Sequence, residues 1–326
     1  MKAIIQTHYG SAESLKITQI DTPTPKPDEI QIKVMATSLN APDWRLLRGK
    51  PFMVRLSSGL FKPKHLVKGT DAAGIVTAIG GNVKTFKVGD EVYADLADSG
   101  FGAFADYVCI DEKLAALKPK TLSFLEAASL PLTAITALQA VRDKAKVKAG
   151  DRVLIVGASG GVGSYAIQHC KRYGAHVTAV VSTGRIAQAT ALGADATIDY
   201  TRTPLDQVSE KYDIVLTING FYPLETYKKL LTSTGHLVLV SSGKMSQILT
   251  ITAFGPLLSK KGGQTYSGFL ARPSGADLAH LSALIDDGHF MPVIEREIAF
   301  EDIPKWIGEL EKGHVGGKIV AWVNQN

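Results

Sequence analysis

The chain is poor in cysteine and has no long apolar run. Its 326 residues include two cysteines, Cys109 and Cys170, which cannot supply a disulfide framework, and no Cys-x-x-Cys pair is present to hold zinc. The longest stretch without Asp, Glu, Lys or Arg is 153–170, and its glycines are typical of a strand, a turn and a helix rather than a membrane span. The N-terminus turns polar after five residues, so it forms no signal-peptide core. We therefore expect a reduced, soluble, cytoplasmic protein.

A strong excess of charge of one sign is also missing. The 36 basic and 31 acidic residues give a net charge of +5, and the basic residues are scattered rather than interleaved with aromatics, which argues against a nucleic-acid interface. Hydrophobic residues make up 45% and charged residues 21% of the chain, a balance that excludes disorder as a description of the whole. At about 150 residues per domain, the length predicts roughly two domains.

The pattern of the chain changes at Ser123. Residues 1–122 predict short strands, such as 72–79 and 91–94, separated by glycine and proline. Ser123 and Glu126 then form the sequence pattern of a capping box, which opens a helix. From there strand and helix patterns alternate, which predicts an α/β fold with a doubly wound parallel sheet of the Rossmann type. Its six strands are expected at 153–156, 177–181, 196–199, 213–218, 236–241 and 264–270.

The last part of the chain returns to the style of the first. Residues 292–298 and 318–323 predict strands on either side of a helix. We therefore expect a β-rich domain in 1–122 and a nucleotide-binding Rossmann domain in 123–264. Residues 265–326 are expected to hold the sixth Rossmann strand and then to return to the β-rich domain.

Three glycines at a spacing of three follow the first strand of the predicted parallel sheet. Gly157, Gly160 and Gly163 lie between the strand at 153–156 and the helix after it. Glycine at these places lets the backbone turn tightly and lets a pyrophosphate approach main-chain N–H groups at the positive end of the helix. In this strand-to-helix context the pattern predicts a dinucleotide-binding loop rather than a structural turn.

The residues after the second strand favour NADPH over NADH. No Asp or Glu lies between Asp151 and Asp195, so a carboxylate that would bind the ribose hydroxyls of NADH and repel a 2′-phosphate is missing from this stretch. Ser182, Thr183 and Arg185 follow the strand instead, and hydroxyls and a guanidinium group suit a phosphate. The alternative interpretation is a solvated arginine at a helix start with a capping serine.

Short motifs spread over the whole chain point to one family. They are Asn40-x-x-Asp43, Gly69-Thr-Asp-Ala-Ala-Gly74, Val88-Gly-Asp-Glu-Val92, Gly102-Ala-Phe-Ala-Asp-Tyr107, Gly157-Ala-Ser-Gly-Gly-Val-Gly163, Leu192-Gly-Ala-Asp195 and Gly313-His-x-Gly-Gly-Lys-Ile-Val320. Together these motifs resemble the zinc-independent branch of the medium-chain dehydrogenase/reductase superfamily, which includes quinone oxidoreductases and alkenal or enone reductases. The resemblance implies a GroES-like catalytic domain built from both chain ends, with an NADP-binding domain between them.

The first two motifs lack the residues that hold zinc. The resemblance implies that zinc-dependent relatives hold catalytic zinc with a cysteine in the first motif and a His-Glu pair in the second. Asn40, Thr70 and Asp71 take these places here. An amide and a hydroxyl are poor zinc ligands, so we expect no metal. Without a Lewis acid, the natural hydride acceptor is already electrophilic, which predicts reduction of quinones or α,β-unsaturated carbonyls by NADPH.

The resemblance also suggests residues near the reacting atoms. Asn40 is expected to donate a hydrogen bond to the charge that develops on the substrate; the alternative is an asparagine that caps the turn before Pro42. Asp43 is expected to steer the substrate, unless it only pairs with Arg45. Thr133 resembles the family's threonine beside the nicotinamide, although a helix-start cap explains it equally well.

A wider set of residues is expected to contact the cofactor besides Thr133. Tyr200 either offers a face to the adenine or is a half-buried tyrosine at the end of the third strand. The other members of the set are Ser159, Gly160, Gly161, Val162, Ser182, Arg185, Asn219, Phe269 and Lys318.

Two other functions and one segment stay open on the sequence. A zinc-free NADPH-dependent reductase of saturated ketones or aldehydes is one alternative, and a non-catalytic NADPH-binding protein that touches RNA is the other. The expected partner is a small-molecule substrate, with a homodimer as one option for assembly. The apolar segment 248–258 is interpreted as a lid, a dimer contact or a membrane-surface patch.

Overall fold

The computed structural model describes residues 1–220, 222–240, 251, 255, 259, 263–313 and 315–324. Contacts between residues divide the chain into two compact units. Unit 1 consists of Met1–Ile135 and Arg272–Asn326, and unit 2 is the single stretch Thr136–Ala271. The helix that begins after Ser123 therefore lies in unit 1, and the strand expected at 264–270 lies in unit 2 with the strands before it.

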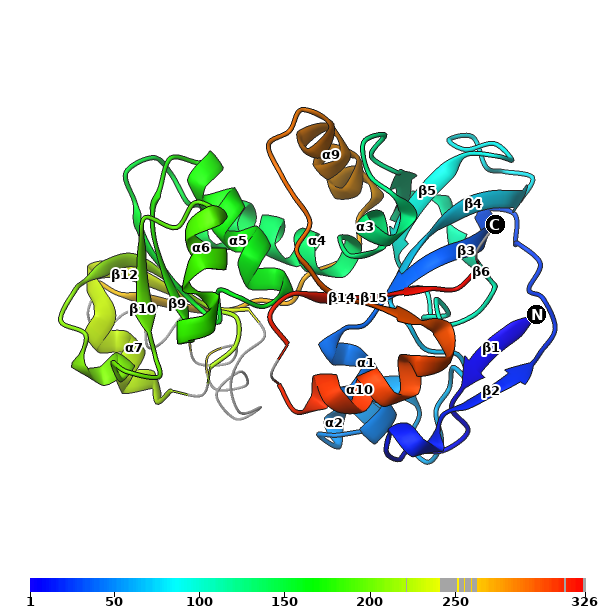
Figure 1. Cartoon of the computed structure of the whole chain (residues 1–326), viewed down its shortest axis with the longest axis horizontal. Coiled ribbons are helices and arrows are strands. Elements are labelled where there is room, and N and C mark those ends of the chain that lie inside the picture. The colour runs from blue at the N-terminus through cyan, green and yellow to red at the C-terminus, as the bar shows by residue number, and fades with distance from the viewer. Residues whose placement is uncertain are drawn as a thin grey trace. The chain divides into compact units, whose positions relative to one another are not determined.

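Within the described residues, unit 2 holds a six-stranded parallel sheet, which confirms the predicted Rossmann-type fold (Figure 1). The order across the sheet is β10-β9-β8-β11-β12-β13, so the chain moves outward from β8 in both directions, as in doubly wound folds. The central strands are runs of Val, Ile and Leu because helices cover both faces of such a sheet. The strands are β8 (Arg152–Val156), β9 (His176–Val181), β10 (Ala196–Asp199), β11 (Tyr212–Thr217), β12 (Leu231–Leu239) and β13 (Thr265–Gly268).

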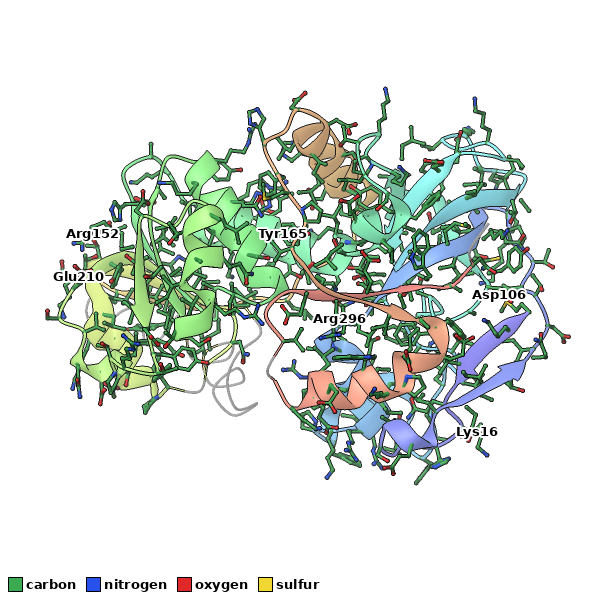
Figure 2. All side chains as sticks on the ribbon, in the orientation of Figure 1. Lys16, Asp106, Arg152, Tyr165, Glu210 and Arg296 are labelled. Carbon is green, nitrogen blue, oxygen red and sulfur yellow. The ribbon has the colours of Figure 1, made fainter. Side chains whose placement is uncertain are left out.

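Helices connect the strands of unit 2. Among the described residues of unit 2, the longest helix is α5 (Gly161–Arg172), which follows β8 and buries Tyr165 completely (Figure 2). At the amino end of β8, Arg152 lies 3.8 Å from Glu210, an exposed pair that Figure 2 shows together at the edge of this unit. The shorter helices are η3 (Ala140–Ala145), η4 (Thr183–Arg185), α6 (Ile186–Ala191), η5 (Leu205–Gln207) and α7 (Leu224–Leu230). Most of the apolar segment 248–258 lies outside the described residues.

Unit 1 holds a mostly antiparallel sheet and a separate pair of strands, β1 and β2. Its order is β14-β15-β3-β4-β5-β7, with β6 also paired to β3. Because β15 pairs with β3, in register Val320 to Ser38, the C-terminal strands complete the sheet of the N-terminal ones. The strands are β1 (Lys2–Ile5), β2 (Lys16–Gln19), β3 (Glu29–Ser38), β4 (Asp71–Ile79), β5 (Glu91–Asp95), β6 (Tyr107–Asp111), β7 (Ala115–Leu117), β14 (Ile294–Ala299) and β15 (Lys318–Trp322).

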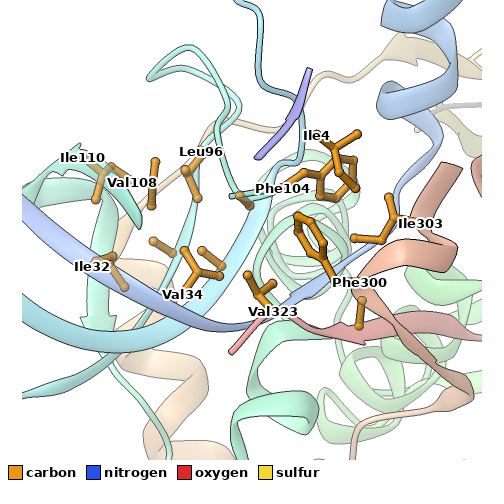
Figure 3. Close-up of a cluster of buried hydrophobic side chains, with 14 of the residues drawn as sticks. Ile4, Ile32, Val34, Leu96, Phe104, Val108, Ile110, Phe300, Ile303 and Val323 are labelled. Atoms are coloured by element: carbon orange, nitrogen blue, oxygen red, sulfur yellow. The ribbon is translucent and has the colours of Figure 1, made fainter. Parts of the chain in front are cut away.

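The core of unit 1 follows from the alternation along β3. Ile30, Ile32 and Val34 are fully buried, and they pack with Phe104 and Phe300 in one hydrophobic cluster (Figure 3). Burial of each such side chain contributes about 1.5–3 kcal/mol. The helices around the sheet are α1 (Ala41–Arg48), α2 (Met53–Ser58), α3 (Phe124–Ala128), α4 (Pro131–Gln139), α9 (Gly275–Asp286) and α10 (Ile303–Glu311), with the short turns η1 (Ala12–Ser14), η2 (Glu112–Leu114) and η6 (Phe300–Asp302).

The start of α3 confirms the capping box predicted from the sequence. The backbone N–H of Glu126 donates to Oγ of Ser123, and the Glu126 carboxylate accepts from the Ser123 N–H at 2.8 Å. Two of the free N–H groups at the helix start are thereby satisfied. Among the described residues, no helix is long and apolar enough to cross a membrane.

Candidate active site and cofactor loop

A buried polar network joins the ends of three strands in unit 1. Asn40 follows β3, Thr70 and Asp71 lie at the start of β4, and Lys318 begins β15. The pairing of Ser38 with both Asp71 and Val320 brings these strand ends together. Water is almost excluded, since Asn40 is 3%, Asp71 0% and Lys318 2% exposed. Buried polar groups of this kind must satisfy one another.

Lys318 is the cation of this network. Its Nζ lies 2.5 Å from Oδ1 of Asn40, 3.1 Å from Oδ2 of Asp71 and 3.2 Å from the carbonyl oxygen of Leu39. An ammonium group has three N–H donors, and three acceptors lie within reach. The cofactor contact predicted for Lys318 would therefore require it to give up one of these bonds.

The amide group of Asn40 is held on both sides. Its oxygen accepts from Lys318, and its Nδ2 donates to Oγ1 of Thr70 and to Oδ2 of Asp71, each at 2.8 Å. Both amide hydrogens are thus used inside the network. Among the described residues, the hydroxyl hydrogen of Thr70 meets no acceptor. Thr70, which the sequence analysis treated only as a replaced zinc ligand, is therefore the member with a hydrogen left to donate.

Asp71 accepts hydrogen bonds from two further donors around the network. Its Oδ2 accepts from Oγ of Ser38 at 2.6 Å, and its Oδ1 accepts from the backbone N–H of Leu132 at 2.9 Å. Hydrogen bonds to an ionised acceptor are about twice as strong as those between neutral groups. The carboxylate therefore fixes β3, β4 and the start of α4 around one point.

Asp43 lies behind Asn40 on α1. Its Oδ2 accepts from the backbone N–H of Asn40 at 2.7 Å, while Oδ1 is buried and has no partner among the described residues. Burial raises the pKa of Asp43 to about 7, an effect that the Asn40 N–H opposes. Arg45, offered as its surface partner, lies over the Trp44 ring at 5.3 Å. Asn40 is the N-cap residue of α1, but its amide enters the network.

Two more ionisable groups nearby are perturbed by burial. Burial raises the pKa of Asp95 to about 8, and the charge of Asp71 on the neighbouring strand adds to the effect. Burial also lowers the pKa of Lys68 to about 8, against the attraction of Asp43. Unusual pKa values of this kind gather at functional sites and also in structural ion-pair networks.

The donor set does not fit a zinc ion. The Lys318 ammonium group already lies against the oxygens of Asn40 and Asp71, and a divalent cation there would have to displace it. Zinc prefers thiolate, imidazole and carboxylate ligands, and Asn40 and Thr70 offer none of these. Within the described part of the chain, no group of three or more His, Cys, Asp or Glu residues is placed to hold a metal.

Thr133 lies on α4 in unit 1. Its hydroxyl group donates to the carbonyl oxygen of Ser129 at 3.0 Å, and that of Leu130 lies at 3.3 Å. The hydroxyl hydrogen is thus taken up by the preceding turn, so Thr133 has only its oxygen left to offer as an acceptor. The predicted position beside the nicotinamide stays a prediction.

The glycine loop of unit 2 has the shape that a dinucleotide needs. Gly157 has φ +83°, and a Cβ there would lie 2.6 Å from the backbone of Asn219. A Cβ on Gly163 would lie 2.3 Å from the carbonyl oxygen of Gly157, so both positions require glycine. Gly160, the N-cap of α5, meets nothing closer than 3.8 Å. Open space before a helix N-terminus suits a pyrophosphate, so the residues present fit a dinucleotide.

The other predicted cofactor residues of unit 2 lie at the carboxyl edge of its parallel sheet. Because all the strands run the same way, the loops that follow them meet at one edge, where ligands bind in such folds. Tyr200 is 49% exposed there. The remaining residues at this edge are Ser159, Gly160, Gly161 and Val162 after β8, Ser182 and Arg185 after β9, Asn219 after β11 and Phe269 after β13. Their contacts with a cofactor stay predictions.

The sequence analysis missed one acidic residue at this edge. Asp199 ends β10, which pairs with β9 in register Asp199 to Val181. Its carboxylate accepts from the hydroxyl group of Thr183, just beyond β9. The stretch between Asp151 and Asp195 holds no carboxylate, as the sequence analysis found, but the neighbouring strand places one beside Thr183. The doubly wound parallel sheet predicted from the sequence could have indicated it, because strands that follow one another along such a chain often lie side by side.

Comparison with known proteins places the chain in a family. Residues 26–120 match the family described as alcohol dehydrogenase GroES-like domain, and 192–320 match the one described as zinc-binding dehydrogenase. The 2-methylene-furan-3-one reductase of Solanum lycopersicum is 34% identical over 98% of this chain and 78% of its own length. The chain belongs to the medium-chain dehydrogenase/reductase family. It is an oxidoreductase of that family, as the sequence predicted.

Two further relatives agree. The protein named NADPH-dependent alkenal/one oxidoreductase, chloroplastic, of Arabidopsis thaliana is 32% identical over 99% of this chain and 79% of its own length. A solved structure named quinone oxidoreductase from Coxiella burnetii superposes with a TM-score of 0.87, at 31% identity over 99% of both chains. These similarities confirm the combination of a GroES-like domain with a Rossmann-type domain.

Proposed function

We propose that the protein reduces quinones or α,β-unsaturated carbonyls with NADPH, without a metal. The observation that carries the proposal is the network around Asn40. Asn40, Thr70 and Asp71 take the places where the resemblance implies zinc ligands, and the Lys318 ammonium group already binds the oxygens of Asn40 and Asp71. The glycine loop of unit 2, which fits a dinucleotide, supports hydride chemistry. The printed names of the relatives from Solanum lycopersicum, Arabidopsis thaliana and Coxiella burnetii support the substrate class.

The substrate class follows from what the network offers. NADPH, when bound, supplies a hydride, and the acceptor atom must be electrophilic without help from a Lewis acid. A β-carbon of an enone or a quinone ring meets this condition. The negative charge that develops on the carbonyl oxygen then needs a hydrogen-bond donor. Thr70 has an uncommitted hydroxyl hydrogen, and Asn40 holds its oxygen in place. We assign Thr70, whose side chain is fully buried in this structure, as the donor to a substrate that reaches the network, and Asn40 as its positioning residue.

The substrate panel that tests this proposal has three members. NADPH consumption is followed with an enone, with its saturated ketone and with a quinone. We expect turnover of the enone and the quinone, and none of the saturated ketone. Turnover of the ketone at a similar rate would favour the alternative reductase. Absence of turnover with all three would overturn the proposal and favour the binding protein, which retention on RNA competed by NADPH would then support.

Zinc independence is tested separately. Exhaustive chelation is expected to leave both the turnover number and the melting temperature unchanged, because the Lys318 ammonium group already binds the oxygens that a metal ion would need. Stoichiometric zinc in the purified protein, with activity lost on its removal, would contradict the proposal. A known zinc-dependent alcohol dehydrogenase treated in parallel shows that the chelation is complete.

The cellular location and the assembly stay predictions. The sequence predicts a cytoplasmic protein, whereas the Arabidopsis thaliana relative is named as chloroplastic, so this comparison does not support the expected location. A homodimer is the expected assembly if there is one. Fractionation of cells and the mass in solution measured by light scattering test the two predictions.

A further inference from the structure

Three oxygen-bearing side chains, those of Thr183, Asp199 and Thr201, form a cluster at the carboxyl ends of β9 and β10. The Thr183 hydroxyl group donates to Oδ2 of Asp199, and the Thr201 hydroxyl group donates to Oδ1 at 2.7 Å. The two threonine oxygens lie 3.0 Å apart. Asp199 also accepts from the backbone N–H of Thr201 at 3.0 Å. The cluster therefore has a fixed shape, with Asp199 at its centre.

The cluster presents acceptors rather than donors. Each threonine hydroxyl group has one hydrogen, and both hydrogens point at Asp199. These hydrogen bonds lower the pKa of Asp199, with that from Thr183 the largest cause, so the carboxylate is charged at neutral pH. What the cluster can offer to a ligand is negative charge and the lone pairs of Thr183 and Thr201.

The cations near the cluster leave this charge only partly balanced. Nε of Arg202 lies 3.5 Å from Oδ2 of Asp199, but the arginine side chain is 75% exposed. Ion pairs this exposed contribute little, because water and salt screen them. Arg185 lies on the same turn as Thr183, and its Nη1 donates to Oε1 of Gln188 at 3.5 Å. Nε2 of Gln188 in turn donates to the carbonyl oxygen of Ser159.

In a doubly wound fold, the residues after the second strand face the 2′ position of the adenosine ribose. In unit 2 that strand is β9, and Thr183 lies two residues beyond its end. We propose that Asp199, acting through Thr183, is a specificity-determining residue. It weakens the binding of NADPH and so lowers the preference of the enzyme for NADPH over NADH. The proposal rests on the proposed function only for the identity of the cofactor.

The physical reason is that the cluster and a 2′-phosphate both offer hydrogen-bond acceptors, with no donor between them. The oxygens of a 2′-phosphate only accept hydrogen bonds, so Thr183 must turn its hydrogen away from Asp199 before it can bind one. The phosphate also meets the charge of Asp199. At a separation of several ångströms and a dielectric constant near that of water, this repulsion amounts to about 1 kcal/mol. The 2′-hydroxyl group of NADH, in contrast, is itself a donor and suits the cluster as it stands.

The test replaces Asp199 by asparagine, which keeps the shape and one acceptor oxygen but removes the charge. Dissociation constants of NADPH and NADH are measured directly by titration, without a hydride acceptor. We expect Asp199→Asn to tighten NADPH binding about three- to tenfold and to change NADH binding less than about twofold. Glu225→Gln is the matched control, since Glu225 is an exposed acid of the same unit that pairs with Lys228. It is expected to change neither constant.

The salt dependence of the NADPH dissociation constant distinguishes an electrostatic role of Asp199 from a structural one. Because the effect is electrostatic, the difference between Asp199→Asn and the unmutated protein is expected to narrow between about 20 mM and about 300 mM NaCl. Asp199→Ser, which keeps a small acceptor without charge, provides a second variant if the asparagine protein folds poorly. Melting temperatures of both variants show whether the turn after β9 is intact.

Two results would overturn the inference. One is an unchanged ratio of the two dissociation constants in both variants with normal melting temperatures. The other is weaker NADPH binding in both, which would mean that Asp199 builds the phosphate site instead of opposing it. Failure of the proposed function looks different, because then the unmutated protein binds neither nucleotide, or it binds NADPH but does not oxidise it when an enone or a quinone is added.

Discussion

Lys318 and Asn40 are 278 positions apart in the sequence, yet Nζ of Lys318 lies 2.5 Å from Oδ1 of Asn40. The same ammonium group forms a buried ion pair with Asp71. Taking charges out of water is costly, and only good geometry with additional hydrogen bonds repays it. The network meets that condition through Leu39, Ser38 and Leu132. Its members consequently depend on one another.

Removal of the cation should therefore destabilise the chain strongly. Lys318→Met leaves Asp71 charged and buried, and we expect the free energy of unfolding to fall by about 3–5 kcal/mol. Lys312→Met is the matched control, because Lys312 pairs with Glu309 on the surface and such pairs are worth about 1 kcal/mol or less. Urea unfolding of both variants measures the difference. Equal losses in the two would contradict the role given to the buried pair.

A double-mutant cycle tests the division of work between Asn40 and Thr70. Asn40→Ala and Thr70→Val are each expected to lower the turnover number by about 10- to 100-fold, because each removes one part of the same donor arrangement. Together they should lower it little further. The dissociation constant of NADPH should stay unchanged in all three variants, and Asn82→Ala, at an exposed asparagine, serves as control. Independent, multiplying effects would mean that Asn40 acts without Thr70.

The carboxyl group of Asp43 predicts a pH dependence of stability. Burial raises its pKa to about 7 in the folded chain, above the ordinary value of about 3.9. The group therefore stabilises the fold below about pH 4, and this contribution is lost as the pH rises through about 7. Between about pH 5 and about pH 8 the unmutated protein should lose about 2 kcal/mol more of its unfolding free energy than Asp43→Asn.

Urea unfolding at the two pH values measures this difference. Asp287→Asn, at an exposed acid just after the end of α9, is the control and should follow the unmutated protein. Parallel pH profiles for Asp43→Asn and the unmutated protein would show that Asp43 is ionised in the folded chain throughout this range.

Two glycines of the cofactor loop should respond differently to alanine. At Gly160 a Cβ meets nothing closer than 3.8 Å and the backbone is extended, so Gly160→Ala should leave the melting temperature unchanged. It should weaken NADPH binding about tenfold or more, because the methyl group fills the space before α5. Gly163→Ala places its Cβ 2.3 Å from the Gly157 oxygen and should lower stability as well. Gly81→Ala, which faces open space, is the neutral control.

The fold could be predicted because its signals are local. Alternation along β3, the capping box at Ser123 and the strand-to-helix context of Gly157 each depend on a few neighbouring residues. These local patterns all predict the same fold, and such agreement between levels is what lets a sequence specify one structure. Residues 292–298 and 318–323 were also expected to be strands, and β14 and β15 are found there.

The candidate site could be predicted only in part, because its contacts connect distant parts of the chain. Motifs singled out Asn40 and Thr70, but not that Asn40 spends both amide hydrogens inside the network. Lys318 was expected at a cofactor, and its three acceptors could not be known before β15 was paired with β3. Asp199 was missed because the search for an acid followed the chain beyond β9, whereas the sheet brings one in from beside it.

The pairing of β15 with β3 also sets an order of events during synthesis. Every strand of unit 2 is made before residue 272, but the polar network lacks its cation until Lys318 has left the ribosome. A nascent chain therefore carries Asp71 and Asn40 for most of its synthesis without the group that compensates them. Premature termination between the end of unit 2 at Ala271 and the start of β15 at Lys318 would yield a protein whose cofactor loop is complete and whose candidate catalytic centre lacks its cation.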